Sequence, residues 1–211
     1  MRSKLPRLHA ITDERVARRP DLAGIAAELA AGGGAELAFH ARGHELSGRE
    51  LFELADRFAA HRPARLFVND RLDVALATGA AGVQLRHRSL APRDARRLNP
   101  EWWVGLSVHD LEEAWAARTA GADYLLVGPV YATGTHRDRA PLASDRLTEI
   151  VRLGLPVIAI GGVTPERVPE LKRAGVYGVA AIRALWDAPD PRAAARAMAL
   201  RATEQGNVSS D

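Results

Sequence analysis

The sequence contains no cysteine and almost no lysine. Without cysteine, the chain has no disulfide, no thiolate metal ligand and no cysteine nucleophile. Lys4 and Lys172 are the only lysines among 29 basic residues, so arginine supplies nearly all of the positive charge. These basic residues are interleaved with 26 acidic ones, which leaves a net charge of +3. Proteins that bind nucleic acids typically show a clustered basic stripe with stacking aromatics, and because the sequence has none, we expect no nucleic-acid partner.

Long hydrophobic runs are missing as well. Nowhere do the roughly 18 uncharged apolar residues that a membrane-spanning helix needs follow one another. The start of the chain, MRSKLPRLHAITDE, is basic but lacks the apolar centre of a signal peptide. We therefore expect a cytoplasmic protein with no membrane partner. The polar residues 204–211 are expected to form a disordered C-terminal tail.

Short apolar segments alternate with longer amphipathic ones along residues 1–203, which we interpret as one domain. The apolar segments are rich in Val, Ile and Leu and predict strands, while those rich in Ala, Leu, Arg and Glu predict helices. The predicted strands are Leu8 to Thr12, Glu36 to Ala41, Arg65 to Val68, Gly82 to Leu85, Val104 to Val108, Tyr124 to Val130, Pro156 to Ile160 and Gly178 to Ile182. The predicted helices are Leu22 to Ala31, Gly48 to Ala60, Arg71 to Ala77, Pro92 to Leu98, Leu111 to Ala120, Ser144 to Leu153, Pro165 to Ala174 and Pro191 to Ala202.

Strict alternation of strand and helix predicts parallel strands joined by right-handed crossovers. Eight units of about 25 residues favour a closed, parallel eight-stranded (β/α)8 TIM barrel over an open sheet. A dinucleotide-binding sheet would carry GxGxxG after the first strand, where this chain has DERVARRPDL. The predicted fold is therefore a single α/β barrel.

Polar side chains cluster where the predicted strands end. In a TIM barrel the carboxyl ends of all strands meet at one mouth, so these positions have priority as a functional site. Five of the seven histidines fall there, counting His136 in the loop after the sixth strand. The residues at these strand ends are Thr12, Asp13, His40, Arg42, His44, Asn69, Asp70, Arg86, His87, Arg88, Ser89, Ser107, His109, Pro129, Tyr131, Gly161, Gly162 and Arg183.

The segments IGGVTPER and GVAAIRAL follow the seventh and eighth strands. Loops at these two places commonly bind phosphate in TIM barrels, through backbone N–H groups and a short helix N-terminus. Glycines allow the backbone to approach the anion closely. The sequence thus predicts a phosphate site at Gly161, Gly162, Ile182 and Arg183. The polar loop Ala132 to Pro141 could cover a charged substrate.

Six segments carry a family resemblance: LHAITDE, VNDRLDVALATGAAGVQL, VGLSVHDLEEA, GADYLLVGPVYATGTH, LPVIAIGGVTPERV and GVAAIRAL. Together they resemble the superfamily of thiamine phosphate synthase and thiazole tautomerase (TenI), in order over nearly the whole chain. The resemblance implies a barrel that binds a phosphorylated thiazole, usually as a homodimer.

The chain departs from the synthase pattern at three positions. The run that grips the pyrimidine pyrophosphate, Gln-Leu-Arg-Glu-Lys, is replaced by residues 40–44, in which only Arg42 matches and His44 takes the place of lysine. Asp70 retains the first Mg²⁺ ligand, but Ser89 replaces the second carboxylate. His136 replaces the lysine of the Thr-x-Thr-Lys loop. These changes remove charge that a leaving pyrophosphate needs.

The resemblance therefore leads us to expect a thiazole tautomerase, an isomerase that needs a general acid or base and no cofactor. The tautomerase histidine is replaced by Pro129, so we expect His40 to be the catalytic group, with His136 second. Expected substrate-binding residues are Arg42, His44, Asn69, Ser107, Thr133 and Thr135. Two alternatives stay open: a divergent thiamine phosphate synthase that binds Mg²⁺ at Asp70, and a non-catalytic binder or regulator that kept only the phosphate site.

Overall fold

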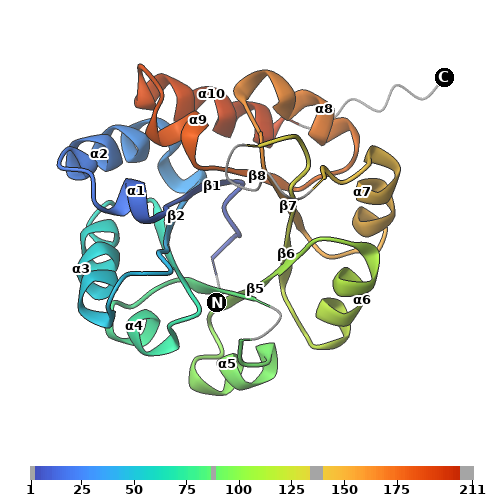
Figure 1. Cartoon of the computed structure of the whole chain (residues 1–211), viewed down its shortest axis with the longest axis horizontal. Coiled ribbons are helices and arrows are strands. Elements are labelled where there is room, and N and C mark those ends of the chain that lie inside the picture. The colour runs from blue at the N-terminus through green and yellow to red at the C-terminus, as the bar shows by residue number, and fades with distance from the viewer. Residues whose placement is uncertain (1–2, 87–88, 134–139, 205–211) are drawn as a thin grey trace.

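A computed structural model describes residues 3–86, 89–133 and 140–204. It contains a closed barrel of eight parallel strands that neighbour one another in chain order (Figure 1), which confirms the predicted TIM barrel. Of the predicted tail, residues 205–211 lie outside the described part of the chain. The strands are β1 (Leu8–Ile11), β2 (Leu37–Ala41), β3 (Arg65–Asn69), β4 (Gly82–Leu85), β5 (Trp103–Val108), β6 (Tyr124–Val127), β7 (Val157–Ile160) and β8 (Gly178–Ala181).

Helices surround the barrel on the outside (Figure 1). Their starts follow from capping residues: Ser47 and Glu50 form a capping box at α3, and the Asp110 side chain accepts a hydrogen bond from Glu113 N at α6. The helices are α1 (Glu14–Ala17), α2 (Leu22–Gly33), α3 (Gly48–Ala59), α4 (Leu72–Ala77), α5 (Pro92–Leu98), α6 (Leu111–Thr119), α7 (Ser144–Val151), α8 (Val168–Arg173), α9 (Arg183–Trp186) and α10 (Pro191–Thr203), with 3-10 turns η1 (Gly34–Glu36) and η2 (Pro165–Arg167).

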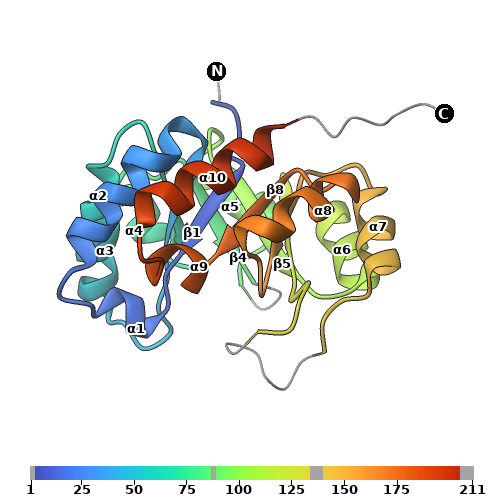
Figure 2. The same cartoon turned by 90° about the horizontal axis from the view of Figure 1, so that it is seen from above.

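The sequence prediction differs from the structure at three short elements. The expected helix from Pro165 to Ala174 is divided into η2 and α8. Helices α1 and α9 were not predicted, because four residues are too few to show a helical period. Both short helices lie at the same end of the barrel (Figure 2).

Two hydrophobic cores stabilise the fold. The larger one lies between the strands and the surrounding helices, and a smaller one fills the interior of the barrel. Phe67 and Tyr124 are the largest side chains of the interior core and are fully buried. Leu5, which precedes the first strand, is also buried in this interior core. The barrel is therefore a packed core rather than a pore, as is usual for this fold.

Glycines on the strands make room for the two interior aromatic rings. A Cβ at Gly105 would lie 2.1 Å from Tyr124 Cζ and 2.5 Å from Gln84 Oε1, and a Cβ at Gly82 would lie 2.5 Å from Phe67 Cε1. All three distances are well below van der Waals contact, so a larger residue would force these neighbours to move.

No helix in residues 3–86, 89–133 and 140–204 has both the length and the apolar character needed to cross a bilayer.

Gly105→Ala should lower the free energy of unfolding by about 1–3 kcal/mol, because the added methyl group overpacks the ring of Tyr124. Urea unfolding measures the change. Gly24→Ala is the matched control: Gly24 lies in α2 with open space around its Cβ position, so alanine there should stabilise the helix slightly. Equal stability of the two variants would contradict this account of the interior core.

Candidate active site

Two adjoining cavities open at the carboxyl ends of the strands. The larger has a volume of about 420 Å³ and is lined by the segments after β7 and β8. The smaller has a volume of about 210 Å³ and lies over the ends of β2 to β6. Ile160, Gly161 and Ile182 line both cavities, so the two form one site with two lobes. We call them the large lobe and the small lobe.

The large lobe is built around the turn that follows β7. Gly161 and Gly162 have φ angles of 97° and 63°, in the left-handed region that favours glycine. A Cβ on Gly161 would lie 2.7 Å from Pro129 Cβ, and one on Gly162 would lie 2.6 Å from the carbonyl oxygen of Ala132. Both the backbone angles and the space therefore require glycine here.

Helix α9 completes the large lobe on the other side. Ile182 is its N-cap residue, and Ile182, Arg183 and Ala184 all line the cavity. The first turn of a helix leaves backbone N–H groups without helical partners, which suits an anion. The predicted phosphate residues Gly161, Gly162, Ile182 and Arg183 thus lie together, and Thr133 lines the same lobe.

Arg167 is a cation of the large lobe that the sequence analysis did not select. It lies in η2, donates from Nη1 to the carbonyl oxygen of Gly162 at 2.5 Å, and places its guanidinium 4.4 Å from the centre of the Tyr131 ring. The planar guanidinium matches a phosphate better than a lysine would. Arg167 is the arginine of the segment IGGVTPER, so the sequence contained a sign of it. Its position inside the predicted helix Pro165 to Ala174 hid its role.

The small lobe gathers Arg42, His44, Asn69 and Ser107, all four of which were predicted to bind substrate. Arg86 and His109, which the sequence analysis noted only as strand-end residues, line it too. Its chemistry is therefore cationic, with several hydrogen-bonding groups.

His44 lies between the two arginines of the small lobe. Arg42 Nη2 donates to His44 Nε2 at 2.6 Å, and Arg86 Nη1 lies 3.4 Å from His44 Nδ1. Burial and then the charges of Arg42 and Arg86 lower the pKa of His44, which keeps the imidazole neutral. Arg42 and Arg86, and not His44, therefore carry the positive charge of this lobe.

Asp70 adopts an unusual backbone conformation beside the small lobe, with φ at 59°. Its carboxylate lies 2.6 Å from Arg86 Nε and accepts a hydrogen bond from Ser89 Oγ. Non-glycine residues in this region are often found at functional sites, where surrounding contacts hold them. Among the residues described, no group of three or more His, Asp and Glu side chains could hold a metal ion. Asp70 and Ser89 nevertheless lie together, as the resemblance implied for the two metal positions.

His40 does not lie where we expected it. The prediction that its side chain points into the open mouth is wrong, because the side chain is fully buried in the barrel interior and lines neither lobe. Its ring stacks on Phe67 with centroids 5.1 Å apart. His40 lies on β2, two residues before Arg42, which follows the end of the strand, and this difference places His40 under the floor of the small lobe. The remaining predicted residues, Thr135 and His136, lie outside the described part of the chain.

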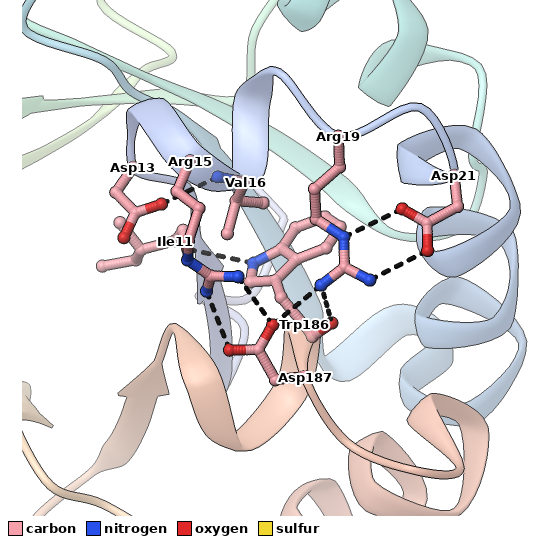
Figure 3. Close-up of polar contacts among 8 residues, drawn as sticks. All are labelled: Ile11, Asp13, Arg15, Val16, Arg19, Asp21, Trp186 and Asp187. Atoms are coloured by element: carbon pink, nitrogen blue, oxygen red, sulfur yellow. Dashed lines mark hydrogen bonds and ion pairs between the residues drawn. The ribbon is translucent and has the colours of Figure 1, made fainter.

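Helix α9 is fastened to the β1 side of the barrel by a charged cluster (Figure 3). Arg15 Nη2 and Arg19 Nη1 approach the two carboxylate oxygens of Asp187 at 2.8 and 2.7 Å. Arg19 also donates to the carbonyl oxygen of Trp186, whose indole N–H donates to the carbonyl oxygen of Ile11. The C-terminal end of α9 is thereby fixed, which in turn holds its N-terminal end against the large lobe.

Comparisons with known proteins agree on one family. A family model described as thiamine monophosphate synthase matches residues 8–185. The thiamine-phosphate synthase of Chlorobium phaeobacteroides is 39% identical over 199 residues, covering 92% of this chain and 94% of that protein. The thiamine-phosphate synthase of Pyrococcus abyssi is 38% identical over 197 residues, covering 92% of each chain. A solved structure of the thiamine phosphate pyrophosphorylase from Pyrococcus furiosus matches with a TM-score of 0.79 and 32% identity, covering 93% of this chain and 95% of that one.

These relatives confirm the superfamily and correct the activity. The prediction of a thiazole tautomerase is wrong, because the relatives that match over nine-tenths of the chain are named thiamine-phosphate synthase. The structure supplies a physical reason. Pro129 lines the small lobe but cannot transfer a proton, and His40, chosen to replace the tautomerase histidine, has no exposed surface with which to reach a substrate.

Asp187→Asn should lower the free energy of unfolding by about 1 kcal/mol, because two arginines lose their shared carboxylate. The matched control is Glu53→Gln, which removes the partner of Arg49 in a single exposed helical pair and should change stability by only about 0.3–0.5 kcal/mol. Urea unfolding at low and high salt measures both variants. If Asp187→Asn is no more destabilising than Glu53→Gln, the cluster does not hold α9.

Proposed function

Because the chain belongs to the thiamine monophosphate synthase family, we propose that it is a transferase that joins a pyrimidine diphosphate to thiazole phosphate. The bond between the pyrimidine methylene group and diphosphate breaks, a bond to the thiazole ring forms, and diphosphate leaves. The observation that carries this proposal is the two-lobed site, in which one wall of Ile160, Gly161 and Ile182 is common to both lobes. Two substrates bound in adjoining lobes would meet at that wall, and such an arrangement removes much of the entropic barrier to their reaction.

In this proposal the large lobe binds the phosphate of the thiazole. Gly161 and Gly162 bring backbone N–H groups close to the anion, and Arg183 and Arg167 add positive charge. Thr133 offers a hydroxyl in the same lobe. The cluster of Asp187 with Arg15 and Arg19 keeps α9 in place, so the phosphate meets a preformed site.

The small lobe then binds the pyrimidine diphosphate. Negative charge develops on the leaving diphosphate during the reaction, and fixed cations stabilise it. In the family pattern, the lysine at the position of His44 provides one such cation. A neutral His44 does not provide it. Arg86 lies 3.4 Å from His44 and lines the same lobe, so it supplies a cation at nearly the same place. With Arg42, the lobe retains two permanent charges.

The donors at Asp70 fit a magnesium ion that arrives with the diphosphate. Mg²⁺ usually takes one or two protein carboxylates and completes its shell with water and substrate phosphate oxygens. Asp70 offers a carboxylate and Ser89, hydrogen-bonded to it, offers a hydroxyl. A bound Mg²⁺ would neutralise charge on the leaving diphosphate. Arg86, paired with Asp70 at 2.6 Å, adds charge at the same side of the lobe.

A homodimer and a cytoplasmic location stay predictions. Light scattering on the purified chain measures the oligomeric state, and a monomer would contradict the first of them.

The purified chain should convert pyrimidine diphosphate and thiazole phosphate into equal amounts of thiamine phosphate and diphosphate when Mg²⁺ is present. Asp70→Asn should lower kcat/KM by about a hundredfold, because it removes the carboxylate proposed for the metal. Asp73→Asn is the matched control, since Asp73 pairs with Arg71 on the nearby surface and should leave the rate unchanged. Thiazole phosphate binding without any turnover would instead favour the non-catalytic binder.

Ser89→Asp should lower the Mg²⁺ concentration for half-maximal rate by about tenfold, because it places a second carboxylate beside Asp70. Ser89→Asn is the control of nearly equal shape without the charge, and it should not produce this gain. If the rate depends on the Mg²⁺ concentration in the same way in both variants, residue 89 does not contribute to Mg²⁺ binding.

A further inference from the structure

Two histidines form a hydrogen-bonded column inside the barrel. His9 Nε2 lies 3.0 Å from the carbonyl oxygen of Pro6, His9 Nδ1 lies 2.8 Å from His40 Nε2, and His40 Nδ1 lies 3.2 Å from the amide oxygen Oδ1 of Asn69. Both histidines are fully buried, whereas Asn69 is only partly buried and lines the small lobe. The column therefore connects the closed barrel interior to the proposed substrate site.

The protons in this column are fixed by what each partner can donate or accept. A carbonyl oxygen only accepts, so His9 Nε2 carries a hydrogen. A neutral His9 then has a bare Nδ1, which must accept the hydrogen of His40 Nε2. A neutral His40 in turn has a bare Nδ1, which cannot bond to the amide oxygen that faces it at 3.2 Å. In a neutral column the Asn69 amide is therefore turned by half a rotation, with its nitrogen facing His40 Nδ1. With the amide oxygen facing Nδ1, as in the 3.2 Å contact, the column needs a third hydrogen and one ring is a cation.

The surroundings favour the neutral column. Apart from each other and Asn69, the rings pack against Phe67 and Tyr124. No ion pair joins either ring to a carboxylate within the described residues, and an unpaired buried cation is unfavourable. Burial lowers the pKa of His9 to about 4, and burial together with the charges of His9 and Arg42 lowers that of His40 well below its usual value.

We propose that the His9–His40 pair is a positioning device that turns the carboxamide of Asn69 so that its N–H₂ donates to His40 and its oxygen faces the small lobe. There the oxygen accepts a hydrogen bond from an N–H group of the substrate. The identification of this substrate as an amino-substituted pyrimidine rests on the proposed function. His9 and His40 touch no substrate, and they act only through Asn69.

The small lobe should therefore prefer a substrate ring that carries an amino group over one that carries a carbonyl at the same position. A ring with an amino group at the position facing Asn69 donates a hydrogen bond to the oxygen. A ring with a carbonyl there opposes one acceptor with another, and a site built for a donor rejects such an analogue strongly. His40 thereby determines specificity from beneath the floor of the lobe.

The proton positions are measured directly by ¹⁵N NMR of the full chain labelled at histidine and asparagine. The proposal predicts hydrogens on Nε2 of both His9 and His40, bare Nδ1 atoms, and nuclear Overhauser contacts between the Asn69 amide hydrogens and the His40 ring at neutral pH. A hydrogen on His40 Nδ1 in the wild-type chain would overturn it. This measurement needs no turnover, so it separates the positioning device from the proposed function, which falls on its own if the wild type makes no thiamine phosphate.

His9→Phe removes the acceptor for His40 Nε2, so His40 is free to carry its hydrogen on Nδ1 and Asn69 is free to turn round. The expected result is an increase of about tenfold in KM for the pyrimidine diphosphate with KM for thiazole phosphate unchanged. His9→Gln keeps both a donor and an acceptor and should retain the wild-type KM. An unchanged pyrimidine KM in His9→Phe, despite a hydrogen on His40 Nδ1, would contradict the proposal. If His9→Phe does not fold by circular dichroism, the wild-type NMR result decides.

Discussion

Closure of eight parallel strands into one barrel is the constraint on which the rest of the structure depends. Because every strand runs in the same direction, every strand ends at the same mouth, and residues far apart in sequence are gathered there. Closure also fixes the width of the interior, which Phe67 and Tyr124 fill only because Gly82 and Gly105 leave space for them. The site and the core therefore follow from a single geometric condition.

In the proposed function, the mouth binds negative charge in two ways. The large lobe would use backbone N–H groups beside Gly161 and Gly162, supported by the arginines that line it. The small lobe relies on the permanent charges of Arg42 and Arg86, because His44 between them stays neutral. This division explains how a chain that lacks several charged residues of its family pattern still presents a cationic site. A charge lost at one position is supplied by another residue that the fold brings to the same place.

The interior of the barrel is not wholly apolar, and its polar groups are the less usual part of the design. A buried polar group is usually hydrogen-bonded, because an unmade hydrogen bond is costly away from water. His9 and His40 meet this requirement through each other, Pro6 and Asn69, which makes the direction of each hydrogen bond depend on the next. A buried network of this kind links the mouth to positions that no ligand can reach.

The sequence by itself determined the alternation of strands and helices, the barrel, the glycine turn at Gly161 and Gly162, and the superfamily, because each depends on local period or on motifs that are contiguous in the chain. The sequence also predicted that Arg42, His44, Asn69 and Ser107 lie together, because the strand ends of a barrel converge. The structure places all four in the small lobe. Tertiary structure alone decided the depth of each side chain: His40 on β2 is buried beneath the lobe, whereas Arg42, just after the strand, lines it. It also decided which cation faces which group, because Arg86, Arg167 and the two partners of Asp187 contact groups that are distant in the sequence.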